Sequence, residues 1–103
     1  MKQIKDIFAL KNVSDDLDRG ERFYEMQESG VGQYFRDCLL SDMESLYLYA
    51  GTHKKYAGAY KLLSRRFPYA IYYTIEKDIV VIVAVLDVRS NPAHTKKMLQ
   101  QRK

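Results

Sequence analysis

The chain has 103 residues, of which 47% are hydrophobic, and this size supports one folded unit, so we expect residues 1–103 to form a single domain. No apolar run reaches the roughly 18 residues of a membrane-spanning helix, and the N-terminal residues lack the apolar core of a secretory signal. We therefore expect a cytoplasmic protein that has no membrane partner.

The net charge of +4 is unevenly distributed along the chain. Residues 1–52 carry a net charge of −4, whereas residues 53–103 carry +8. A basic half of this kind suits a phosphate backbone or an acidic protein partner. The alternative is that these lysines and arginines only keep the surface solvated.

The first half of the chain predicts a strand followed by two helices. Residues 4–10 are expected to form a short strand, and Ser14 is expected to be the N-cap of a helix that runs to about residue 29. A glycine-containing turn leads to a second helix, over residues 33–50, with an apolar stripe along one side. Because the link between the two helices is short, we expect them to form an antiparallel hairpin.

The second half predicts a loop at residues 52–58, then three strands, and a last helix over residues 93–101. The third strand, residues 79–88, is apolar at nearly every position. A strand that is apolar on both faces is expected in the middle of a covered sheet, and the two preceding helices are the expected cover. Strict alternation would place one set of side chains on one face and a second set on the other: Val80, Ile82, Ala84 and Leu86, against Ile79, Val81, Val83 and Val85.

The middle strand, residues 70–76, contains two adjacent tyrosines whose environments are expected to differ. Tyr73 is in phase with the isoleucines of this strand and is expected in the core, whereas Tyr72 is expected to be exposed. The predicted order of elements is β-α-α-β-β-β-α. We therefore expect an α+β fold in which a helical hairpin packs on a small, mostly antiparallel β-sheet.

The candidate functional residues are cations on or near the predicted strands, with His94 nearby. They are Lys54, Lys55, Lys61, Arg65, Arg66 and Arg89. Guanidinium groups bind phosphate and stabilise the negative charge that develops when a phosphodiester is cleaved, and a histidine can transfer the proton. Lys61 and Arg65 are four residues apart and are expected to share a strand face. The alternative is a solvated sheet edge beside an unremarkable histidine.

Other kinds of site have little support in the sequence. Cys38 lies on the apolar side of the second predicted helix and is expected to be a small buried side chain. A phosphate-binding glycine loop, a metal-ligand cluster and a serine triad are not recognisable. We therefore expect neither a metal nor another cofactor.

Two segments carry a resemblance to a known family. The segment RFPYAIYY, from Arg66, and the segment IVVIVAVLDVRSNP, from Ile79, resemble the RelE/ParE superfamily of bacterial toxins. The segments DDLDRGERFYE and GVGQYFRDCLLSDMESL are similar to the first and second helices of that family, so the resemblance covers residues 13–95. It implies a small α+β toxin of a type II toxin–antitoxin pair, held inactive by a cognate antitoxin.

The resemblance implies one of two activities. RelE-like members cleave mRNA on the ribosome, and in that case Arg65, Arg89 and His94 would be the catalytic residues. ParE-like members act on DNA gyrase, and the six cations would then bind the target. His94 lies five residues after Arg89 and behind a proline, whereas RelE-like members place a Tyr or His sooner, so we favour the ParE-like activity. An inactive, toxin-like binding module is the third hypothesis, and the expected antitoxin has an acidic or amphipathic segment.

Overall fold

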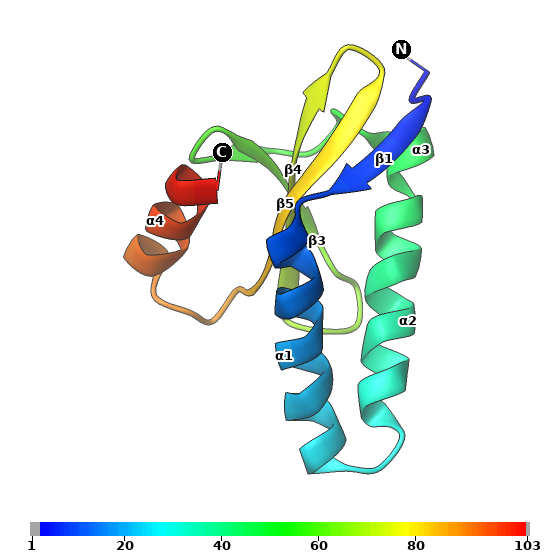
Figure 1. Ribbon diagram of the computed structural model, residues 1–103, viewed down its shortest axis with the longest axis vertical. Helices are drawn as coiled ribbons and strands as arrows, with labels where there is room; N and C mark the ends of the chain where they lie inside the picture. The colour runs from blue at the N-terminus through cyan, green and yellow to red at the C-terminus, as the bar shows by residue number, and fades with distance from the viewer. Residues whose placement is uncertain (1–2, 103) are drawn as a thin grey trace.

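The structure is a computed structural model that describes residues 3–102, and it has the α+β architecture that the sequence predicts (Figure 1). The elements in order are β1 (Asp6–Ala9), α1 (Lys11–Gln27), α2 (Val31–Glu44), α3 (Leu46–Tyr49), β2 (Lys55–Tyr56), β3 (Ala59–Leu63), β4 (Tyr69–Glu76), β5 (Ile79–Asp87) and α4 (Pro92–Arg102). The predicted order of elements is confirmed, with two short additions, the one-turn helix α3 and the two-residue strand β2.

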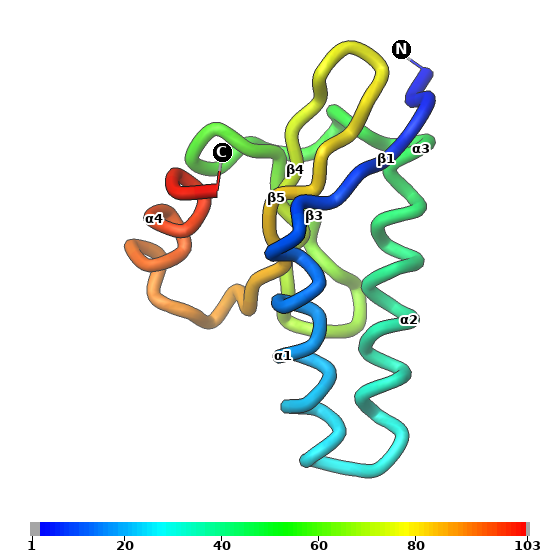
Figure 2. The backbone as a smooth tube through the Cα atoms, in the orientation of Figure 1, coloured from blue at the N-terminus to red at the C-terminus, as the bar shows by residue number. Residues whose placement is uncertain are grey.

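The strands form one sheet in the order β1-β5-β4-β3-β2, in which β1 runs parallel to β5 and every other pair is antiparallel. Apolar side chains of α1 and α2 pack on one face of this sheet, and Leu99 of α4 packs on the other. Figure 2 shows the α1–α2 hairpin extending beyond the strands, with α4 separate from it beside the sheet. The predicted antiparallel hairpin is confirmed, but it covers only one face, and α4 provides the second cover.

A β-bulge in β5 corrects the predicted division of its side chains between the two faces. Tyr72 pairs with Ala84 and Tyr73 pairs with Ile82, so Val83 is an extra residue in the ladder. The extra residue shifts the alternation by one position, which a strict period of two cannot anticipate. As a result Val80, Ile82 and Val85 pack toward the hairpin, whereas Val83, Ala84 and Leu86 pack toward α4.

The two adjacent tyrosines of β4 are both buried, which confirms one prediction and contradicts the other. Tyr73 is fully buried on the hairpin side, as predicted. Tyr72 is only 2% exposed, because it packs with Leu99 beneath α4. The prediction that Tyr72 is exposed was wrong because the final helix was not expected to cover that face.

The helix boundaries differ from the predicted ones for tertiary reasons. The first helix begins at Lys11 rather than after Ser14, since Leu10 donates its N–H to the carbonyl of Ile82 and accepts a hydrogen bond from Val13 N–H. Pairing with β5 therefore sets the start of α1. The second predicted helix is divided at Ser45, which donates its hydroxyl to the carbonyl oxygen of Asp42 at 2.6 Å.

Asp16 of α1 is a buried carboxylate that connects α1, β5 and α4. Its Oδ2 accepts the backbone N–H of Val85 at 3.0 Å, and its two oxygens accept bonds from the Arg102 guanidinium at 2.5 and 2.9 Å. The ladder of β1 ends where Ala9 meets Ile82, so Asp16 supplies an acceptor to β5 beyond the last residue of β1. Arg19 of the same helix also donates to Asp16, at 2.5 Å, so it is removal of Asp16 that would leave the largely buried Arg102 guanidinium uncompensated.

Gly20 lets the two long helices approach closely. A Cβ at this position would lie 2.5 Å from Cζ of Phe35, whose ring is fully buried. Because neighbouring atoms surround that ring, it has little freedom to move away. Close contact at this point determines the spacing of α1 and α2.

We expect Gly20→Ala to destabilise the protein by about 1–3 kcal/mol through overpacking against Phe35. Alanine is the better helix former by about 1 kcal/mol, so helix propensity alone gives the opposite sign. Urea denaturation measures the difference. If the ring is the cause, adding Phe35→Leu should cost less in the Gly20→Ala background than in wild type, and additive effects would contradict this explanation.

We expect Val83→Asp to unfold the domain, because an unpaired carboxylate beneath α4 costs several kcal/mol against a total stability of about 5–15 kcal/mol. Circular dichroism during heating tests this directly. Val88→Asp is the matched control, since Val88 lies just beyond β5 and is 39% exposed. A cooperative melt of Val83→Asp near the wild-type temperature would contradict the assignment of Val83 to the core.

Candidate functional site

The structure places the predicted cations of the first strands on different faces of the sheet. Lys55 pairs with Tyr60, which packs against the core beneath the hairpin, whereas Lys61 pairs with Tyr72 on the α4 side. Each ammonium lies over an aromatic ring, Lys55 at 5.0 Å from the centroid of Tyr60 and Lys61 at 5.4 Å from that of Tyr56. The two lysines therefore present their charge on opposite sides, and the carbonyl of Lys54 accepts the N–H of Lys61.

Arg65 and Arg66 lie in the loop between β3 and β4 and not on a strand. β3 ends at Leu63, so the prediction that Lys61 and Arg65 share a strand face was wrong. The strand is shorter than the spacing argument assumed, because Pro68 and the residues before it form a bend ahead of β4.

An aromatic cluster fixes the position of this loop. The ring of Phe67 lies 4.7 Å from Tyr24, 5.1 Å from Phe35 and 5.7 Å from Tyr34, measured between centroids. The carbonyl of Pro68 accepts the N–H of Val88 at 2.8 Å. Arg65, Arg66 and Arg89 are therefore held at the same end of the sheet.

Arg89 is exposed but is paired with a carboxylate on its own turn. Its Nε donates to Asp87 Oδ1 at 3.0 Å, and its Nη2 donates to Asp87 Oδ2 at 2.7 Å. This bidentate bond lowers the pKa of Asp87 and raises the pKa of Arg89. A target that needs the Arg89 guanidinium must share it with Asp87 or displace that carboxylate.

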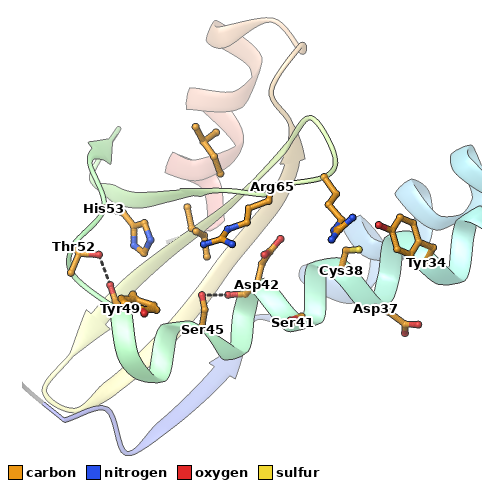
Figure 3. Close-up of a pocket in the computed structure, with 13 residues that line it drawn as sticks. Tyr34, Asp37, Cys38, Ser41, Asp42, Ser45, Tyr49, Thr52, His53 and Arg65 are labelled. Carbon is orange, nitrogen blue, oxygen red and sulfur yellow. Dashed lines mark hydrogen bonds between the residues drawn. The ribbon is translucent and has the colours of Figure 1, made fainter.

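Arg65 and Arg66 line a groove of about 820 Å³ between α2 and the end of β3 (Figure 3). The opposite wall belongs to α2 and α3, and His53 closes one side. In Figure 3 the side chains of Arg65 and Asp42 point into the groove from opposite walls. Cys38 lines the same groove and is partly buried against the core, so the prediction of a small buried side chain is confirmed only in part.

Burial favours the neutral form of His53 beside this groove. Its Nδ1 lies 2.5 Å from the hydroxyl of Tyr73, and that hydroxyl accepts the N–H of Gly51 at 2.9 Å. Burial lowers the pKa of His53 and raises the pKa of Tyr73. Because the Tyr73 hydroxyl accepts the Gly51 N–H, its own proton is available for donation to Nδ1 of His53. The proton of neutral His53 then lies on Nε2, which can act as a donor.

His53 and Asp42 are two polar residues of this groove that the sequence did not single out. Asp42 lies between two residues of the apolar stripe in the second predicted helix, so the helical periodicity marks this position only as polar. His53 lies in a predicted loop, where no periodicity indicates which way a side chain points. The basic pair that follows His53, Lys54 and Lys55, was the local feature that could have indicated a functional site there.

His94 lies away from Arg65. It lines a second hollow, between α1, the end of β5 and α4, together with Arg19, Asp87 and Arg102. Arg65 and His94 thus belong to two different cavities, and Arg89 is bonded to Asp87. The roles of the six cations and His94 remain predictions.

Within residues 3–102, no group of three or more His, Cys, Asp or Glu side chains is arranged to hold a metal ion. In the same part of the chain, no helix combines the length and apolar character needed to cross a membrane.

One solved structure resembles this chain closely in fold. It is described as "Chromosomal ParDE TA system from P. aeruginosa" and superposes with a TM-score of 0.70, covering 81% of this chain and 94% of that one. The chain has a RelE/ParE-like fold. The two sequences are only 12% identical, so the RelE/ParE-like likeness concerns the fold alone. No protein-family model and no curated protein matches the sequence.

We expect the free energy of unfolding of this RelE/ParE-like fold to decrease at acidic pH because His53 becomes protonated. Because folding lowers the pKa of His53, the unfolded chain binds the proton more readily, and the free energy of unfolding falls as the pH drops through the unfolded value of about 6.5. The decrease ends below the lower, folded pKa.

Urea denaturation between about pH 7.5 and pH 5, a range that brackets the histidine pKa, measures the effect. His53→Gln keeps a hydrogen-bonding group without titrating, and it should flatten the dependence. His94→Gln leaves His53 in place and should retain it. An unchanged pH dependence in His53→Gln would contradict the prediction.

Proposed function

We propose that this chain is the toxin of a type II toxin–antitoxin pair, that it halts growth by acting on DNA gyrase, and that a cognate antitoxin neutralises it. The observation that carries the proposal is the fold likeness to a structure described as a ParDE system, which covers most of both chains. The RFPYAIYY and VLDVRSNP segments, which resemble the same superfamily, support it from the sequence.

The arrangement of the candidate residues favours action on a protein target over RNA cleavage. General acid–base catalysis requires the acid or base within hydrogen-bond reach of the reacting group, directly or through one water. Arg65 and His94 line separate cavities, and Arg89 is already bonded to Asp87. A ribosome-dependent nuclease would need these three residues at one phosphate.

The proposed target-binding residues are the cations near the margins of the sheet. Arg65, Arg66 and Arg89 lie at one end of it, and the lysines at positions 54, 55 and 61 lie on or next to β2 and β3. A rigid sheet that presents cations suits an acidic surface, and it also suits an acidic or amphipathic antitoxin segment. Binding of either partner through these charges should weaken as salt concentration rises.

Brief induced expression in bacteria, followed by parallel assays of DNA and RNA, tests the proposal. Gyrase poisoning predicts double-strand DNA breaks, a damage response and loss of supercoiling by purified gyrase. Rapid, codon-biased mRNA cleavage with intact DNA would replace the proposal with the nuclease hypothesis. Normal growth with folded protein would indicate an inactive binding module.

We expect Arg89→Ala to leave folding intact and to reduce growth inhibition. The exposed pair with Asp87 contributes little to stability, whereas the guanidinium is part of the proposed binding surface. Growth after induction and thermal melting of the purified variant measure the two effects. Lys77→Ala is the matched control, because Lys77 lies in the turn at the other end of β5. Loss of folding in Arg89→Ala would show that the residue is structural.

A further inference from the structure

The groove beside α2 is long and follows one side of the helices. Its lining residues on α2, α3 and the residue between them follow the i, i+3, i+4 spacing of one helical face: Tyr34, Asp37, Cys38, Ser41, Asp42, Ser45 and Tyr49. From the first to the last, this row extends about 22 Å at 1.5 Å per residue. Small-molecule sites are usually compact clefts, whereas peptide segments lie in elongated grooves. The shape therefore suits a peptide of about seven extended residues.

Large apolar side chains are exposed along the walls of this groove. Tyr34 is 46% exposed at one end and Tyr49 is 55% exposed at the other, and Leu63 of β3 is 58% exposed. Apolar side chains that gather along one groove are typical of an interaction site. They would contact apolar residues of a bound segment.

Asp42 gives the groove a specific chemical requirement. Its Oδ2 is buried from solvent and has no hydrogen-bond partner among the residues that the structure describes. An unsatisfied buried acceptor is costly, and a charged one more so, so Asp42 would gain strongly from turning this oxygen toward a donor in the groove. Arg65 points into the groove from the opposite wall, yet this oxygen remains without a bond (Figure 3).

The opposite wall determines which way a cation in the groove must point. Arg65 and Arg66 belong to that wall, and the Arg66 guanidinium lies 5.9 Å from the ring centroid of Tyr34. A cationic group on a bound segment is repelled from these guanidinium groups and attracted to the α2 wall. Asp42 is the carboxylate near the middle of that wall.

We propose that this groove is a docking site for a partner segment that carries one arginine or lysine between apolar residues, and that Asp42 binds its cationic group. Apolar neighbours in the segment contact Tyr34, Tyr49 and Leu63. The proposal adds a recognition site to the proposed function and does not depend on action at gyrase, because peptide binding is measured directly.

Selection of phage-displayed peptides on the purified protein, followed by measurements with synthetic peptides, tests the docking site. The best peptide is compared with a copy in which citrulline, which is neutral and of the same shape, replaces arginine. Binding is measured on wild type and on the variants Asp42→Asn, Asp37→Asn and Arg65→Ala, with circular dichroism to verify folding. Asp37 is the matched control, since it lies on the same wall but already accepts a bond from Gln33 at 2.8 Å.

We expect selected peptides to carry a basic residue, and citrulline to weaken binding to wild type about tenfold, or about 1.4 kcal/mol. Asp42→Asn should abolish the difference between the two peptides, and Asp37→Asn should preserve it. Selection that yields no binder, or binders without a basic residue, would overturn the proposal. The proposal would also be overturned if the selected peptide bound Asp42→Asn as tightly as wild type but no longer bound Arg65→Ala. The groove would then recognise an acidic group.

Discussion

The buried carboxylate of Asp16 is the interaction on which the arrangement of the whole fold depends. β1 is short, so β5 continues beyond it without a strand neighbour on that side, and a backbone N–H would be left without an acceptor. Asp16 accepts that N–H from Val85 and holds Arg102 of the last helix at the same time. One side chain thereby fixes α1, β5 and α4 relative to one another.

The bulge at Val83 distributes the apolar side chains of β5 between two covers. Val80, Ile82 and Val85 pack beneath the hairpin, whereas Val83 and Ala84 pack beneath α4. Because both faces are buried, the strand is a rigid support, and the turn after it holds Arg89 in a constant place. Phe67 has the same effect on the neighbouring loop, so the arginines at this end of the sheet depend on core packing for their positions.

Much of the fold follows from the sequence, because periodicity reports burial well. The stripe that contains Phe35 and Leu39 and the two-sided apolar strand both predicted what the structure shows. Tyr72 could not be placed, since its burial depends on a distant helix of weak apolar character. The groove was not predictable either: Arg65 and His53 lie in loops, where tertiary contacts rather than a repeating pattern determine the direction of a side chain.

The bond between Asp16 and Arg102 has a consequence for synthesis on the ribosome. The two residues are 86 positions apart, so at about 5–20 residues per second Arg102 is made roughly 4 to 17 s after Asp16. Throughout that interval Asp16 has only Arg19 of its own helix as a cationic partner, and one face of β5 has no helix over it. The contact between α1 and α4 therefore forms only after Arg102 has been made, and until then the sheet face that Leu99 covers offers chaperones an uncovered apolar surface.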